Sequence, residues 1–74
     1  MKKFMYAWLF GDKEERVTTW TLENQEGRTV LENLTNEKLL QVLNALGEDG
    51  WEAVSVDSSP TRVLLKKEFN LLPL

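Results

Sequence analysis

The fold is decided by the stretch Leu43-Asn44-Ala45-Leu46-Gly47-Glu48-Asp49-Gly50-Trp51-Glu52-Ala53-Val54-Ser55-Val56. Its first half carries leucines at helical spacing, its centre carries two glycines, and its second half alternates in the manner of a strand. We therefore predict a helix that ends at Gly47, a turn through Gly50, and a central strand that begins at Trp51. Trp51 is expected to pack against the end of the helix as a core residue.

The helix extends back from this stretch toward the N-terminus. Leu39, Leu43 and Leu46 recur at helical spacing and form an apolar face. Thr35 is the expected N-cap, since its hydroxyl accepts a hydrogen bond from a first-turn amide in helices of this kind. The sequence therefore predicts one helix, from Thr35 to Gly47, whose leucines face the core.

An antiparallel hairpin is predicted before the helix. Residues 3–10 alternate as a strand does, and residues 15–22 are rich in β-branched and aromatic types. Gly11-Asp12-Lys13 is expected to form the turn between them. Residues 28–31 are interpreted either as a short third strand or as part of an irregular connection.

A second pair of strands follows the helix, at residues 51–56 and 62–69, with a turn at residues 57–61. The pattern predicts a single α+β domain over residues 1–74, with the order β-β-α-β-β. Its antiparallel sheet has about four strands, and the helix packs on one face of that sheet.

One row of apolar side chains is left without a cover in this arrangement. The first strand is apolar on both faces, and a single helix covers only one of them. Three covers are considered: a second copy of the chain, the apolar tail at residues 71–74 folding back, or a different partner. A homo-oligomer is the simplest, with a dimer favoured, because most soluble oligomers are symmetric.

Composition excludes several classes of function. The chain has no Cys and no His, which rules out disulfides and thiolate metal sites and removes the commonest general base. The net charge is −3, and the basic pairs Lys2-Lys3 and Lys66-Lys67 are too short to make a phosphate-binding patch. In a strand, moreover, the side chains of Lys66 and Lys67 point to opposite faces.

The carboxylates of Glu48, Asp49 and Glu52 are interpreted as a solvated turn, not as a catalytic or cation site. We predict a cytoplasmic protein that is not an enzyme. It is expected to bind no metal, no cofactor, no nucleic acid and no membrane.

The helix end and the following turn also resemble a known family. Leu43-Asn44-Ala45-Leu46-Gly47 followed by Gly50-Trp51-Glu52 is similar to the signature of DUF4177, a family of small bacterial and phage domains. The strand at residues 63–67 and the aromatic first strand at residues 4–8 also fit. The resemblance covers about residues 35–67, and residues 17–34 and 69–74 depart from it. It implies a compact α+β domain, and it supplies no catalytic or ligand residues.

The aromatic residues of the first half are the candidate interface: Phe4, Tyr6, Trp8 and Trp20. For the two tryptophans, a place in the core and a place at an interface are weighed equally. The function predicted is a non-enzymatic protein-interaction or self-associating module.

Two alternatives to this function are kept open. The first is a small-ligand binding domain, in which the same aromatics line a pocket and Arg16 or Arg28 binds a carboxylate. The second is a phage or bacterial inhibitor that sequesters a host protein.

Overall fold

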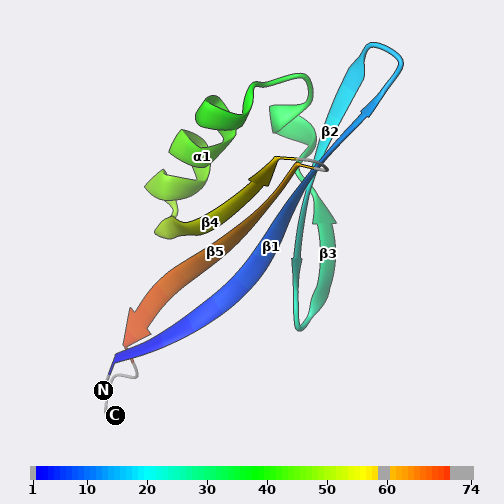
Figure 1. Ribbon diagram of the computed structural model, residues 1–74. Helices are drawn as coiled ribbons and strands as arrows, with labels where there is room; N and C mark the ends of the chain where they lie inside the picture. The colour runs from blue at the N-terminus through cyan, green and yellow to red at the C-terminus, as the bar shows by residue number, and fades with distance from the viewer. Residues whose placement is uncertain (1, 59–60, 71–74) are drawn as a thin grey trace.

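The computed structural model describes residues 2–58 and 61–70. Within these residues the chain forms a five-stranded antiparallel sheet and one α-helix, with the strands in the order β3-β2-β1-β5-β4 (Figure 1). The predicted α+β class agrees with this, but the predicted strand count was too low. The apolar tail at residues 71–74 and part of the predicted turn at residues 57–61 lie outside the described residues.

The first hairpin turns later than the sequence predicted. Strand β1 is Lys2–Glu14 and β2 is Val17–Asn24, so the turn lies at residues 15–16 and not at Gly11-Asp12-Lys13. Gly11 lies within β1, opposite Trp20. A Cβ atom on Gly11 would come within 2.6 Å of the Trp20 ring, so this glycine makes room for a side chain and does not bend the chain.

The remaining strands complete the sheet on both sides of β1. Strand β3 is Gly27–Val30, which settles the alternatives for residues 28–31 in favour of a strand. Strand β4 is Trp51–Ser58 and β5 is Thr61–Asn70. The central strand is β1, and β4 lies at an edge, which corrects the prediction of a central strand beginning at Trp51.

The helix α1 spans Leu39–Glu48 and is preceded by a short 3-10 turn, η1, at Glu32–Leu34. The predicted N-cap was wrong: Lys38 holds that position, and its N–H donates to the Gln41 Oε1 (3.0 Å). The Thr35 hydroxyl instead donates to the Glu32 carbonyl oxygen (2.8 Å).

The later helix start has a cause in the segment that precedes it. Asn36 is bound to β2, because its N–H donates to the Thr18 carbonyl oxygen (2.9 Å) and its Oδ1 accepts from the Thr18 N–H (2.8 Å). Its φ of 68° lies in the left-handed region, which an α-helix does not use. The helix can therefore begin only after this attachment.

The end of the helix also differs from the prediction. Gly47 is a helical residue, and Gly50, with φ of 96°, supplies the left-handed conformation that the sequence assigned to Gly47. A residue without a side chain adopts this conformation at little cost, so Gly50 allows the chain to leave the helix and enter β4.

The core lies between α1 and one face of the sheet. Trp51 and Leu46 are buried there as predicted, and Leu39 and Leu43 are partly buried against the same cluster. The other buried residues of the cluster are Ala7, Leu9, Trp20, Val42, Val63 and Leu65.

The molecule is elongated, with extents of 49 × 22 × 22 Å. A strand of thirteen residues is about 43 Å long at a rise of about 3.3 Å per residue, so β1 accounts for the long axis. At the end where Lys2 pairs with Asn70, β1 and β5 run beyond the helix as a ribbon (Figure 1).

Candidate interaction surface

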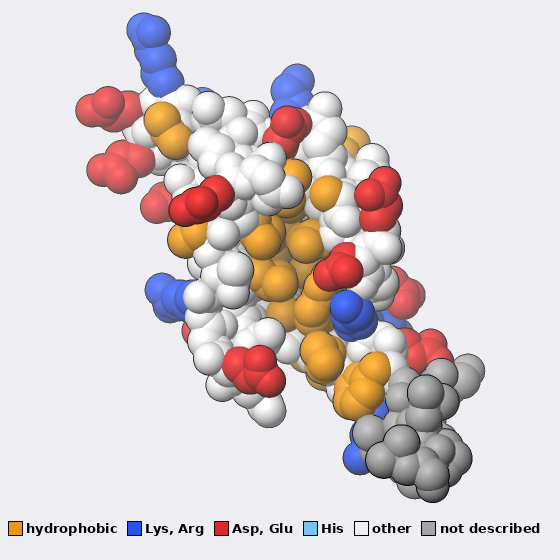
Figure 2. Space-filling model, turned by 180° about the vertical axis from the view of Figure 1, so that it is seen from behind, with side chains coloured by type: hydrophobic (Ala, Val, Ile, Leu, Met, Phe, Trp, Pro, Cys, Tyr) orange, Lys and Arg blue, Asp and Glu red, His pale blue; other side chains and the backbone are white. Residues whose placement is uncertain are grey.

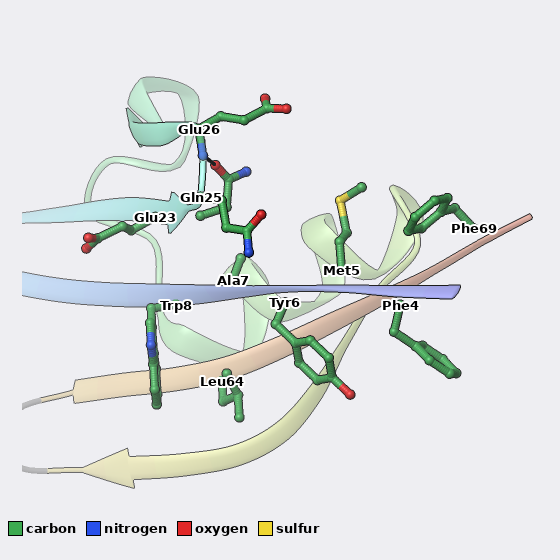
Figure 3. Close-up of a pocket in the computed structure, with 11 residues that line it drawn as sticks. Phe4, Met5, Tyr6, Ala7, Trp8, Glu23, Gln25, Glu26, Leu64 and Phe69 are labelled. Atoms are coloured by element: carbon green, nitrogen blue, oxygen red, sulfur yellow. Dashed lines mark hydrogen bonds between the residues drawn. The ribbon is translucent and has the colours of Figure 1, made fainter. Parts of the chain in front are cut away.

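Three of the four predicted interface residues lie together on the sheet face away from α1. Phe4, Tyr6 and Trp8 are 44%, 55% and 38% exposed, whereas the alternate residues Ala7 and Leu9 are buried beneath the helix. Figure 3 shows Phe4, Tyr6 and Trp8 on one side of β1 and Ala7 on the other. The alternation predicted for this strand is therefore present.

The fourth residue, Trp20, lies elsewhere. It is only 4% exposed, on the helix side of the sheet, and its Nε1 donates to the Glu37 carbonyl oxygen (2.9 Å). Of the two places weighed for this side chain, it occupies the core. Trp20 is therefore not part of the exposed aromatic surface.

Cationic side chains from β5 lie over the aromatic row. The Arg62 guanidinium is 4.9 Å from the centre of the Trp8 ring, and the Lys66 ammonium is 4.9 Å from the centre of the Phe4 ring. Lys67 lies over Trp51 on the opposite face, so the two lysines diverge as predicted. The aliphatic stems of Arg62 and Lys66 cover part of the apolar surface, which the sequence analysis did not anticipate.

Apolar side chains also gather on the face of the molecule that Figure 2 shows. Figure 2 shows them in the middle of the view and toward its lower right, with acidic and basic side chains at the border. Large apolar groups that remain exposed in this way often mark an interaction site.

The most distinctive feature of this surface is a notch beside the N-terminal half of β1. Strand β2 is paired with β1 only as far as Trp8, opposite Glu23, whereas β5 follows β1 down to Lys2. The hairpin formed by β2 and β3 diverges from β1 below that point (Figure 1). The notch has a volume of about 660 Å³ and is lined by residues 4–8, residues 23–26, Leu64 and Phe69 (Figure 3).

Hydrogen bonding in the sheet shows which backbone groups of β1 face the notch. The backbone N–H and C=O groups of successive residues alternate in direction along a strand. The Leu31 N–H donates to the Trp20 carbonyl oxygen, so the backbone groups of Trp20 point toward β3. The next residue, Thr21, therefore faces β1, where it pairs with Phe10. Every second residue of β1, counted from Phe10, directs its backbone N–H and C=O to that side.

Counting back by two from Phe10 gives Trp8, which is still paired with β2, and then Tyr6, Phe4 and Lys2. In the part of the chain that the structure describes, no strand lies on that side of these three residues. Their backbone donors and acceptors form an open sheet edge, and such an edge is a template for pairing with another strand. Apolar side chains flank it on both faces, with Phe4 and Tyr6 on one and Met5 on the other.

The wall of the notch opposite β1 is acidic. Glu23 lies near the end of β2 and Glu26 lies in the turn to β3, which is held by a hydrogen bond from the Glu26 N–H to the Asn24 Oδ1 (2.8 Å). The Glu23 carboxylate binds the Arg28 guanidinium at 3.2 Å, so Arg28 is already engaged. Arg16 lies at the far end of β1, in the turn to β2. The structure therefore does not bring either arginine to the notch as a free anchor for a carboxylate.

The acidic turn at Glu48, Asp49 and Glu52 is exposed, and Asp49 lies 3.7 Å from the Lys67 ammonium. Across residues 2–58 and 61–70, no group of three or more acidic, His or Cys side chains is placed to hold a metal ion. Over the same residues, no helix has the length and apolar character needed to cross a membrane.

The sequence predicts the side chains of this surface but not its open edge. One local signal indicated the edge. The apolar alternation runs the whole length of residues 3–10, whereas residues 23–26, at and just after the end of β2, are all polar. Comparisons of the chain with protein-family models, with curated proteins and with solved structures found no match.

Proposed function

We propose that this protein is a non-enzymatic protein-interaction module that binds an extended protein segment as an added strand on the open edge of β1. The observation that carries the proposal is the edge itself: Lys2, Phe4 and Tyr6 direct backbone hydrogen-bonding groups to a side of β1 on which residues 2–58 and 61–70 place no strand. Strand addition is a common mode of peptide recognition, in which main-chain hydrogen bonds supply affinity and alternate side chains supply specificity.

The side chains around the edge suit an extended apolar segment. Phe4 and Tyr6 offer aromatic contacts on one face of the added strand, and Met5 and Phe69 offer apolar contacts on the other. The ribbon of β1 and β5 is also narrow at this end, and a two-stranded ribbon has little stability of its own. An added strand therefore stabilises the module as well as binding to it.

Charge favours a neutral or basic segment over a nucleic acid or a small anion. Glu23, near the end of β2, and Glu26, in the turn that follows, line the notch, and the chain as a whole carries a net charge of −3. Phosphate and carboxylate groups would be repelled there, since they require clustered Lys and Arg. The proposal includes a cytoplasmic location, which the lack of Cys fits, and the resemblance of residues 35–67 to the DUF4177 signature, which adds no function.

The test uses peptides selected from a random decapeptide library displayed on phage. We expect the enriched peptides to alternate apolar residues and, when added to the protein, to slow amide hydrogen exchange at Phe4 and Tyr6. Phe4→Pro removes one N–H from the open edge and should abolish binding. Leu40→Ala, at a position 74% exposed on the helix, should leave binding unchanged.

Two results would contradict the proposal. One is the failure of repeated selections to enrich any peptide. The other is a set of peptides that protect residues of α1 or β4 and leave the amides of Phe4 and Tyr6 unaffected.

A further inference from the structure

We infer that the segment that fills the notch is β1 of a second copy of this chain, paired antiparallel about a two-fold axis that passes beside Phe4. The inference rests on the proposed function of the open edge, and it adds the identity of the partner and the register of the pairing.

The length of the open edge determines the register. Among the residues that the structure describes, Lys2, Phe4 and Tyr6 are the ones that present unpaired backbone groups on this side of β1 before β2 occupies it at Trp8. In an antiparallel pair, residues that face each other exchange two hydrogen bonds. Setting Lys2 opposite Tyr6 of the second copy and Phe4 opposite Phe4 uses all three residues of each chain. A shift by two residues in either direction leaves edge groups unpaired.

The charges of the edge and the notch are complementary in this register. Lys3, which is exposed, lies near the N-terminal end of the edge, and the acidic turn with Glu26 lies at the other end. Antiparallel pairing brings Lys3 of the second copy toward that turn and places its aliphatic stem opposite Met5. Parallel pairing in register would set Lys3 beside Lys3, and like charges directly opposite are unfavourable.

Two-fold symmetry also limits the contact through β1 to two copies. The same residues of both copies form the contact, so each copy fills the notch of the other. No open edge of β1 remains for a third chain. The two sheets join into one continuous sheet through the two β1 strands, and Phe4 of each copy lies beside Phe4 of the other.

Disulfide cross-linking tests the register directly, because the chain has no cysteine of its own. Directly paired residues at the two-fold axis have Cα atoms about 5.5 Å apart, which lies within the range that a disulfide spans. Phe4→Cys should therefore give a covalent dimer on mild oxidation, and a reductant should reverse it. Val30→Cys is the matched control, since Val30 is similarly exposed (51% against 44%) but lies on β3, and it should give no covalent dimer.

Phe4→Cys removes the Phe4 ring, which could itself weaken the pairing, so a second cross-link leaves this ring in place. Lys3 of one copy faces Met5 of the other in the inferred register, with Cα atoms about 4.5 Å apart. An equimolar mixture of Lys3→Cys and Met5→Cys should form several times more covalent dimer than either variant alone. Equal yields from the three samples would overturn the register.

Light scattering of the unmodified chain separates this inference from the proposed function. We expect a dimer at micromolar concentrations that dissociates on dilution. A monomer at every concentration, together with peptides that bind the edge, would overturn the second copy as partner and leave strand addition in place. A dimer that shows neither cross-link would overturn the edge pairing, and the absence of both dimer and peptide binding would overturn the proposed function as well.

Discussion

Asn36 attaches the segment before the helix to β2 and sets where the helix begins. It combines a left-handed φ of 68° with two hydrogen bonds to the backbone of Thr18. Asparagine is among the few residues that adopt this conformation at modest cost, and its side-chain oxygen is also an acceptor. One side chain therefore attaches the connection to the sheet and sets the start of α1.

Replacement of Asn36 separates these two contributions. We expect Asn36→Ala to lower the free energy of unfolding by about 2 kcal/mol, because it loses the acceptor and also strains the left-handed backbone. Asn36→Gly keeps the conformation and should cost about 1 kcal/mol. Urea denaturation of the two variants measures both values. Equal losses would show that the backbone conformation contributes nothing.

The two glycines at the end of the helix make a second residue-scale prediction. Gly47 is helical, and a Cβ atom placed there meets nothing within 4 Å, so Gly47→Ala should stabilise the protein by about 0.5 kcal/mol. Gly50 has φ of 96°, so Gly50→Ala should destabilise it by about 1–2 kcal/mol. Thermal unfolding of the two variants measures both changes in stability. A destabilised Gly47→Ala together with a stabilised Gly50→Ala would show that Gly47, and not Gly50, needs the left-handed conformation.

At the scale of the element, β1 performs two tasks along its length. Its C-terminal half is paired on both sides, with β2 and β5, and belongs to the centre of the sheet. Its N-terminal half is paired with β5 alone and presents the open edge. The change occurs at Trp8, because β2 reaches its end at Asn24 and turns into β3.

Proline substitution tests the direction of the backbone groups in β1. Phe4→Pro removes an N–H that faces the notch, so we expect the monomer to lose less than about 1 kcal/mol of stability. Met5→Pro removes an N–H from the side paired with β5, opposite Lys67, and should cost about 1–3 kcal/mol. Urea denaturation at low protein concentration gives both values. A greater loss for Phe4→Pro would reverse the assignment of the two sides.

At the scale of the whole molecule, the two faces of the sheet differ in what they contribute. The face under α1 holds the buried cluster, with Leu9 and Val63 wholly inaccessible to solvent. The opposite face holds the exposed aromatic row beneath Arg62 and Lys66. Stability is therefore concentrated on one face, and the surface available for interaction lies on the other face and at its edge.

A pair of substitutions in β1 measures this difference. Leu9→Ala empties a fully buried position and should cost about 2–5 kcal/mol, which is a large part of the stability of a domain of this size. Tyr6→Thr, at a position 55% exposed, should change the stability of the monomer by less than about 0.5 kcal/mol and weaken peptide binding at the notch. Urea denaturation and peptide titration provide the two readouts. Similar stability losses in both variants would contradict the separation of roles.

Local patterns explain the parts of the fold that were predicted from the sequence. The leucine spacing indicated α1, and the alternation of β1 placed Phe4, Tyr6 and Trp8 on one face. Gly50-Trp51 marked the entry to a strand that packs on the helix. Each of these features depends on residues within a few positions of one another, where helical and strand periodicity are encoded.

Only the tertiary structure decided the position of the first turn, the start of the helix, the placement of β4 at an edge, and the open edge of β1. These depend on contacts between residues far apart in the chain: Gly11 against Trp20, and Asn36 against Thr18. The sequence by itself determined which side chains would form an apolar row. The register between strands determined that this row ends in a notch, because pairing is set by packing across the sheet and not by the pattern within one strand.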